Sequence, residues 1–142
     1  LVALALPVLH RAGTHHQESL FERGVAALVS EERALDESMQ GIIDVLRSNK
    51  YSVAQVRQAL DTQAVAWGAL NARFAGARID ARSRYANLHR QLVTYTSLRA
   101  RAAQSLAASL RFQDEIKARE GAALLASARA LEPAFRDQIH PR

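Results

Sequence analysis

Apolar residues recur at every third or fourth position along most of the chain, which is the period of an amphipathic helix. The first such stretch runs from Glu18 to Ser48 and has one polar interruption, at Glu32. Its apolar positions are Phe21, Val25, Leu28, Leu35, Met39, Ile42 and Leu46. Because their spacing alternates between three and four residues, it predicts one long helix with a single apolar face.

A second helix is predicted directly after a polar turn. Ser52 is followed three residues later by Gln55, which is the pattern of a capping box at a helix start. Residues 53–74 then repeat the alternating spacing, with Trp67 among the apolar positions and Gln63 as the polar interruption. A short turn between two long helices makes them antiparallel neighbours.

Two further helices are predicted beyond residue 80. Gly76 is the only helix-breaking residue near the second boundary, and Asp80 is the expected cap of the third helix. A reversal is expected over residues 112–115, with Asp114 as the cap of a fourth apolar stripe that ends at Leu131.

The fold class follows from these stretches, since no segment alternates as a strand would. We predict an all-α protein, an antiparallel up-down-up-down four-helix bundle. The alternative is three long, coiled-coil-like helices, in which residues 80–131 form one continuous helix.

The two ends of the chain differ from the bundle, which we place over residues 17–132. Residues 1–9 are almost wholly apolar, but they are fewer than the ~20 needed to cross a bilayer. Residues 1–16 are therefore expected to form an apolar arm, or the tail of a membrane anchor, followed by a linker. Residues 133–142 contain two of the three prolines and are expected to form a C-terminal tail.

Composition narrows the possible chemistry. The chain has no Cys, which excludes disulfides, thiol catalysis and Cys-ligated metals. Its five His lack the spacing of a helical metal site, and its six Gly form no nucleotide-binding motif. We therefore expect no metal, no cofactor and no catalytic residue, and a protein that is not an enzyme.

Charge is distributed unevenly along the chain. Residues 73–101 contain seven of the 17 Arg and one acidic residue, whereas residues 18–44 contain seven acidic residues and two Arg. Neighbouring helices could pair these charges along their flanks. The sharper hypothesis is an anion site, because the guanidinium fork suits carboxylate and phosphate. Its expected members are Arg73, Arg78, Arg82, Arg84 and Tyr85, with Arg78 and Arg82 on one helical face.

The polar interruptions suggest a second candidate site. If the first two helices are antiparallel about residues 49–51, Glu32 lies level with Trp67, and Gln63 lies nearer Glu37. Glu32 and Gln63 are then not expected to meet. Such polar residues commonly fix helix register. The alternative is that Glu32 and Trp67 line a ligand pocket between helices.

Short segments of the chain suggest a family. They are Asp44-Val45-Leu46-Arg47 followed by Tyr51, then Arg73-Phe74, and Arg84-Tyr85-Ala86-Asn87-Leu88. In this layout the chain resembles the extracytoplasmic all-helical sensor domains of bacterial receptors and histidine kinases, of the four-helix-bundle and double all-helical types. The resemblance implies a small organic anion bound between helices, signalling by helix displacement, and a homodimer.

We therefore predict a non-enzymatic sensor or interaction module, membrane-anchored and periplasmic, with a cytoplasmic location as the alternative. A structural coiled-coil protein that binds a helical partner is a second hypothesis. A nucleic-acid-binding bundle that uses the Arg-rich face is a third, disfavoured because that segment has few aromatic residues and no helix-turn-helix.

Overall fold

Four helices form where the apolar periodicity predicts them. The computed structural model describes the backbone of residues 2–140 and the side chains of residues 13–140. The helices are α1 (Val2–Ser48), α2 (Val53–Gly76), α3 (Ala86–Phe112) and α4 (Glu115–Ile139), and the described residues contain no strand. The predicted all-α four-helix bundle is confirmed, and the three-helix alternative is wrong because the chain reverses between α3 and α4.

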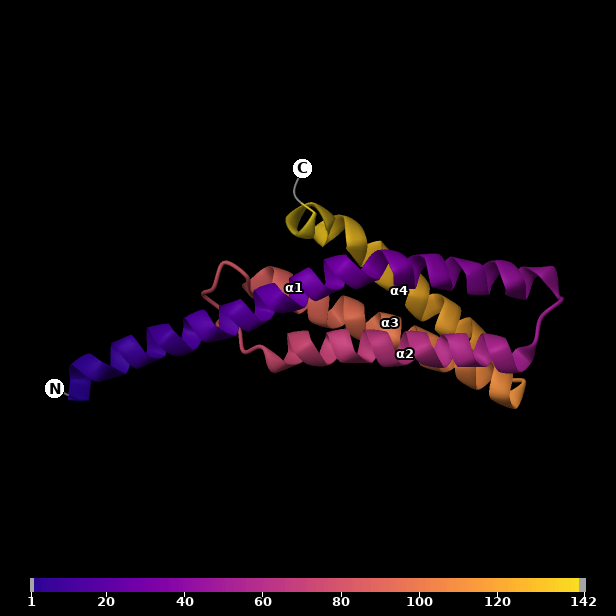
Figure 1. Ribbon diagram of the computed structural model, residues 1–142, viewed down its shortest axis with the longest axis horizontal. Coiled ribbons are helices and arrows are strands. Elements are labelled where there is room, and N and C mark those ends of the chain that lie inside the picture. The colour runs from indigo at the N-terminus through magenta and orange to yellow at the C-terminus, as the bar shows by residue number, and fades with distance from the viewer. Residues whose placement is uncertain (1, 141–142) are drawn as a thin grey trace.

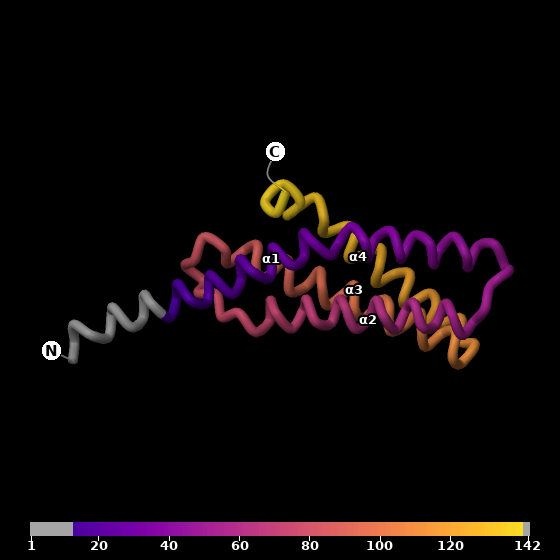
Figure 2. The backbone as a smooth tube through the Cα atoms, in the orientation of Figure 1, coloured from indigo at the N-terminus to yellow at the C-terminus, as the bar shows by residue number. Residues whose placement is uncertain are grey.

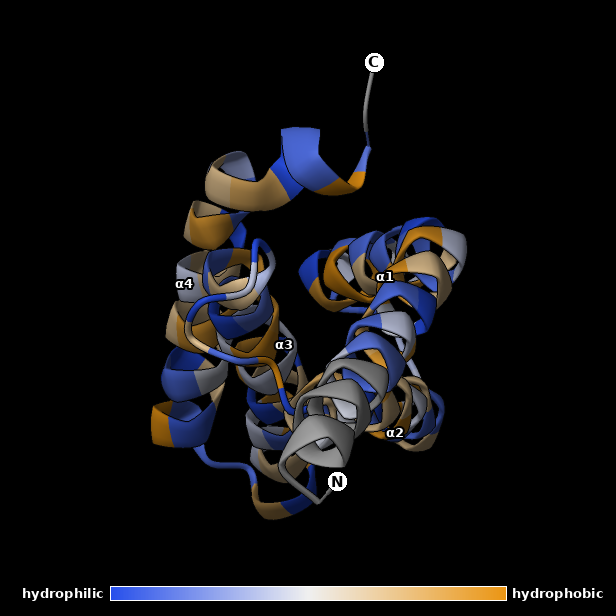
Figure 3. Cartoon of the chain, turned by 90° about the vertical axis from the view of Figure 1, so that its left-hand side faces the viewer, coloured by the Kyte–Doolittle hydropathy of each residue, from blue (hydrophilic) through white to orange (hydrophobic). Residues whose placement is uncertain are grey.

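The helices run up and down in chain order (Figure 1). The turns α1–α2 and α3–α4 lie at one end of the bundle, and the α2–α3 loop lies at the other (Figure 2). α3 packs closely along both α2 and α4, whereas α1 packs mainly along α2. Figure 3, which looks along the bundle, places α1 beside α2 and α3 beside α4.

Local side chains fix where two of the helices begin. The Ser52 hydroxyl accepts the backbone N–H of Gln55 at 3.4 Å, which caps α2. The Asp114 carboxylate accepts two backbone N–H groups of the first turn of α4, at 2.9 and 3.2 Å. The preceding helices end close to residues with left-handed backbone, Asn49 (φ 56°) and Gln113 (φ 51°). The predicted caps at Ser52 and Asp114 are therefore confirmed.

The apolar stripes meet in two adjoining groups of buried side chains. The larger group is aromatic and includes Phe21, Trp67, Phe74, Tyr95 and Phe135. The smaller group is aliphatic and includes Met39, Ile42, Val56, Leu60 and Leu125. All apolar positions predicted for the first helix are buried or half-buried, so the predicted apolar face of α1 is confirmed.

The structure of the α2–α3 loop contradicts the prediction that Asp80 caps the third helix. Asp80 does not cap a helix, because α3 begins only at Ala86. Instead the Asp80 carboxylate accepts the backbone N–H of Arg82 at 2.8 Å, and its carbonyl accepts that of Ser83 at 2.9 Å. An Asp that satisfies its own neighbours in this way stabilises a turn, which competes with helix formation.

The two ends of the chain also differ from expectation. The side chains of the apolar segment 1–9 lie outside the described residues, but residues 13–16 of the expected linker belong to α1. At the other end, α4 continues through Pro133 to Ile139, because the side chains of Phe135 and Ile139 are buried one turn apart. Over the described residues, we find no helix with the length and apolar character that crossing a bilayer requires.

Candidate functional site

Two charged side chains are buried in the middle of the bundle, Glu32 of α1 and Arg99 of α3. Charged groups are seldom buried unless they are paired. Both belong to one group of polar side chains from α1, α3 and α4, which we call the central polar cluster. Its members are Glu32, Asp36, Tyr95, Arg99, Glu132 and Arg136.

Glu32 is held mainly by Arg136 of α4. The two guanidinium nitrogens Nη1 and Nη2 donate to the two carboxylate oxygens at 2.7 and 2.8 Å. The Tyr95 hydroxyl donates to Oε1 of Glu32 at 3.0 Å, and His140 Nε2 lies 3.7 Å from Oε2. Two-pronged Arg–carboxylate pairs are the strongest of these contacts, so Arg136 is the principal link between α1 and α4.

Glu132 connects the same groups from the α4 side. Its Oε2 accepts from Arg136 Nη2 at 2.8 Å, and its Oε1 lies 3.1 Å from the Tyr95 hydroxyl. A phenol has a single proton, so Tyr95 donates to Glu32 or Glu132 but not to both. Tyr95 therefore lies between two carboxylates, one on α1 and the other on α4.

Arg99 reaches the cluster from α3. Its Nη1 lies 2.8 Å from Oδ1 of Asp36 and donates to the Tyr95 hydroxyl at 3.2 Å. Its guanidinium carbon lies 4.3 Å above the centre of the Trp67 ring, which is a cation–π contact. Nε and Nη2 of Arg99 are buried without a hydrogen-bond partner, so the burial of this charge is incompletely compensated.

Trp67 ties the cluster to α2. Its indole N–H donates to Oε1 of Gln63 at 3.0 Å, and Gln63 Nε2 donates to the backbone carbonyl of Leu35 at 2.8 Å. The side-chain amide of Gln63 thus accepts the hydrogen bond of the Trp67 indole and donates a second one to α1. Polar residues on an apolar face commonly fix helix register through such hydrogen bonds.

The surroundings shift three pKa values in the cluster. Burial acts to raise the pKa of the Glu32 carboxyl, but the hydrogen bonds and charge of Arg136, with Tyr95 and His140, outweigh burial and leave it below its usual value. Burial raises the pKa of the Tyr95 phenol, against the charge of Arg99. The hydrogen bonds to Glu32 raise the pKa of Arg136. Glu32 is therefore ionised, and Tyr95 protonated, near neutral pH.

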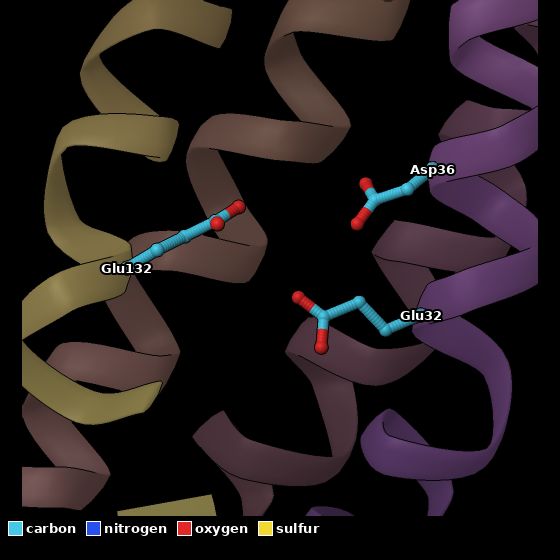
Figure 4. A group of neighbouring side chains, drawn as sticks. All are labelled: Glu32, Asp36 and Glu132. Carbon is cyan, nitrogen blue, oxygen red and sulfur yellow. The ribbon is translucent and has the colours of Figure 1, made fainter. Parts of the chain in front are cut away.

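Three carboxylates of the cluster point toward one another across the space between α1 and α4 (Figure 4). They belong to Glu32, Asp36 and Glu132, and one oxygen of each lies within 4.8 Å of the others. Such oxygens suit a divalent cation, but all three carboxylates already form ion pairs with Arg99 or Arg136, and a metal would have to displace both arginines. The geometry is that of an ion-pair network rather than of a metal ligand set.

The cluster opens to solvent along the line where α1 faces α4, which we call the α1–α4 seam. A groove of about 330 Å³ lies there over Glu32, Asp36, Glu132 and Arg136. A second groove, of about 530 Å³, continues the seam toward the end of α1 and is lined from Met39 to Arg47 and from Ala122 to Arg129. The seam thus has a polar part and a mainly apolar part.

The structure places the two central predicted residues close together. The Trp67 and Tyr95 ring centres lie 5.5 Å apart, and the Tyr95 hydroxyl donates to Glu32. Glu32 and Trp67 are therefore on two sides of Tyr95, but Trp67 is fully buried and does not line the groove over Glu32. Gln63 contacts the backbone of α1 at Leu35 and makes no described hydrogen bond to Glu32.

The other five predicted residues lie at the end of the bundle that contains the α2–α3 loop. Arg78 and Arg82 belong to the loop, so the prediction that they share a helical face is wrong. Arg73 is exposed in the last turn of α2. Arg84 lies 3.8 Å from Glu22 of α1 and stacks 4.7 Å over the ring of Tyr85, whose hydroxyl donates to Glu22 at 2.6 Å.

A groove of about 500 Å³ borders this loop, and its lining includes two of the predicted arginines, Arg82 and Arg84. Its lining also includes the carboxylates of Glu18 and Asp80. Acidic groups beside the arginines weaken the case for an anion site there. The observed pairing of Arg84 with Glu22 matches the intramolecular alternative.

Sequence reasoning missed most of the central polar cluster. The sequence contains two pairs of polar residues spaced by four positions, Tyr95 with Arg99 and Glu132 with Arg136. Residues at this spacing share a helix face, and each pair lies next to an apolar stripe, which could have indicated a polar cluster. The sequence does not identify Arg136, because Pro133 predicts that the fourth helix ends before it.

Comparison with known proteins gives no match, whether with family models, with curated proteins or with solved structures. A proposal for function therefore depends on the geometry of the cluster and the seam. The likeness to sensor domains, the membrane anchor and the periplasmic location stay predictions.

Proposed function

We propose that this chain is a non-enzymatic helical bundle that binds a small ligand in the α1–α4 seam and responds by moving α1. One observation carries the proposal. α1 packs mainly along α2, and beside its apolar core contacts it is joined to α3 and α4 in the middle of the bundle by the ion pairs and hydrogen bonds of the central polar cluster. A helix held by ion pairs beside an open groove can be released by a ligand that competes for those pairs.

The exposure and the charges of the central polar cluster support such a response. Arg136 is half-buried at the opening of the seam, so a ligand can reach its guanidinium without unfolding the core. A ligand shifts a conformational equilibrium only by binding its two states unequally. Ion pairs supply that inequality, because a competing charge acts on them directly.

The same contacts favour binding over catalysis. Glu32 is ionised and held by Arg136, and the pKa of Tyr95 is raised, so neither is poised to transfer a proton near neutral pH. Arg99, one of the seven arginines of residues 73–101, is buried against Asp36. It is therefore removed from any face that could meet nucleic-acid phosphates.

The test uses the absence of native Cys. Spin labels on Ala34→Cys in α1 and Ala130→Cys in α4, both exposed, report the α1–α4 distance by pulsed dipolar spectroscopy. A thermal-shift screen of small organic acids and amino acids supplies the ligands. We expect hits to change the distance by about 2 Å or more, and Glu32→Gln to shift it without ligand.

Matched labels on Val65→Cys in α2 and Ala130→Cys provide the control, because no ion pair within residues 13–140 joins α2 to α4. Their distance is expected to stay constant. No hit in the screen, or hits that leave the α1–α4 distance unchanged, would overturn the proposed function.

A second candidate is self-association, favoured by apolar side chains at the α3–α4 turn. Phe112 is 70% exposed and Ile116 is 75% exposed, and neighbouring exposed apolar groups commonly mark interaction surfaces. Sedimentation velocity tests this candidate. A wild-type dimer that becomes monomeric in Phe112→Ser plus Ile116→Ser supports it, whereas a wild-type monomer at high concentration contradicts it.

A further inference from the structure

The apolar part of the α1–α4 seam differs in charge from the polar part. The lining of the polar groove includes four carboxylates, those of Glu32, Asp36, Glu37 and Glu132, beside Arg33, Arg136 and His140. The groove of about 530 Å³ has only two charged groups along its lining, Arg47 and Arg129. The apolar part of the seam therefore favours an anion more than the polar part does.

Small side chains on α4 leave this groove open. Ala122 and Ala126 lie one turn apart and line one wall, where larger apolar residues would fill the space. Met39, Ile42 and Leu46 of α1 provide the facing wall. Leu106 of α3 completes the lining, so the result is an aliphatic groove between α1 and α4 with a volume in the range of small-molecule sites.

The two arginines are available to a ligand. Arg47 on α1 and Arg129 on α4 are exposed, and neither has an ion pair within residues 13–140. The stretch of α1 from Met39 to Arg47 rises about 12 Å, which suits an extended aliphatic chain of medium length. Apolar walls and unpaired guanidinium groups together match a molecule with an acyl chain and an anionic head.

We propose that this groove binds an aliphatic carboxylate of medium chain length, with its chain against Met39, Ile42 and Ala126 and its carboxylate on an arginine at the groove end. This inference rests on the proposed function, for which it names the ligand class. A guanidinium binds a carboxylate through two parallel hydrogen bonds, and the chain removes apolar surface from water.

The experiment is a calorimetric titration of the whole chain with hexanoate, octanoate and decanoate. We expect the affinity to rise about fourfold for each added methylene. Ala126→Leu is expected to weaken decanoate binding at least tenfold by filling the groove. Ala123→Leu is the matched control, because Ala123 is exposed on the same helix but outside the groove, and it should bind like wild type.

The contribution of the ligand carboxylate is tested separately from the fit of its aliphatic chain. Wild type should bind decanoate at least tenfold tighter than decanol, and Arg47→Gln plus Arg129→Gln should abolish that preference. If Ala126→Leu does not fold, as judged by circular dichroism, Ala122→Leu replaces it. Affinity independent of chain length, equal weakening by Ala126→Leu and Ala123→Leu, or equal binding of decanoate and decanol would overturn the inference.

The two proposals fail in different ways. Decanoate that binds as described without changing the Ala34–Ala130 label distance would overturn the moving-helix function and leave the ligand class standing. A different acid that changes the distance, with no binding of decanoate, would overturn the ligand class alone.

Discussion

The molecule contains two ionic groups built from the same kinds of residue but in different surroundings. In each, a Tyr hydroxyl donates to a Glu of α1, and an Arg stacks on an aromatic ring. In the central polar cluster the Glu32 side chain is 4% exposed and that of Arg99 is 0% exposed. At the α2–α3 loop the Glu22 side chain is 53% exposed and that of Arg84 is 73% exposed.

From this difference we expect burial, and not the number of arginines, to decide which group contributes more to the free energy of unfolding. Exposed ion pairs contribute about 0–1 kcal/mol, because water and salt screen them. Removing one partner of a buried pair leaves a charge that water cannot reach, which costs about 3–5 kcal/mol. The central polar cluster should therefore be sensitive to substitution, and the loop group tolerant.

The largest expected effect is that of Glu32→Ala. It removes both hydrogen bonds that Arg136 makes to α1 and the carboxylate that accepts from the Tyr95 hydroxyl on the α1 side. We expect the free energy of unfolding to fall by about 3 kcal/mol, as measured by urea denaturation. Glu22→Ala, the equivalent change at the loop, should lower it by less than about 1 kcal/mol. Equal losses in the two variants would remove the contrast between the groups.

The next effect is that of Trp67→Phe. It removes the indole N–H that donates to Gln63 and weakens the contact under Arg99. We expect a loss of about 2 kcal/mol in the free energy of unfolding, because the Gln63 oxygen is left buried without a donor. Tyr85→Phe at the loop should lower it by less than about 1 kcal/mol. A larger loss in Tyr85→Phe than in Trp67→Phe would reverse the comparison.

Acid should weaken the central polar cluster through Glu32. Its pKa in the folded protein lies below the ordinary value of 4.5, so the unfolded chain binds its proton first as the pH falls. The stability contributed by Glu32 is complete above 4.5 and is lost as the pH falls through the folded pKa. Denaturation at a series of pH values should show a shallower acid-side slope for Glu32→Gln than for wild type. Identical slopes would contradict the assignment.

The smallest effect is expected at the loop arginines. Arg78→Ala plus Arg82→Ala should change the free energy of unfolding by less than about 0.5 kcal/mol, because both side chains are exposed. The variant should keep every thermal shift that small organic acids produce in wild type. Loss of such a shift would restore the loop as an anion site.

Local signals predicted most of the fold. The alternating spacing from Phe21 to Leu46 identifies the buried face of α1, and Ser52 and Asp114 mark two helix starts. Such signals work because capping and helical periodicity depend on residues only a few positions apart. The start of α3 was missed because the turn at Asp80 competes locally with a helix.

The central polar cluster was predicted only in part, since its contacts join distant positions. Glu32 and Arg136 are 104 residues apart, and no period connects them. Glu32 and Trp67 could be placed together because both belong to the first helix pair, whose register follows from one short turn. Arg99 and Arg136 depend on how α3 and α4 pack, which the spacing of single stripes does not determine.

Because of Pro133, the last turns of α4 are expected to unfold locally while the rest of the bundle stays folded. Proline has no N–H, so the carbonyl of Arg129 lacks its usual helical donor. The turns beyond it, which contain Arg136 and Ile139, bend away from the rest of α4 (Figure 1). In amide hydrogen exchange, residues 134–139 should therefore exchange as one sub-global unit while α2 and α3 stay protected. Each such opening would separate Arg136 from Glu32 without unfolding the bundle.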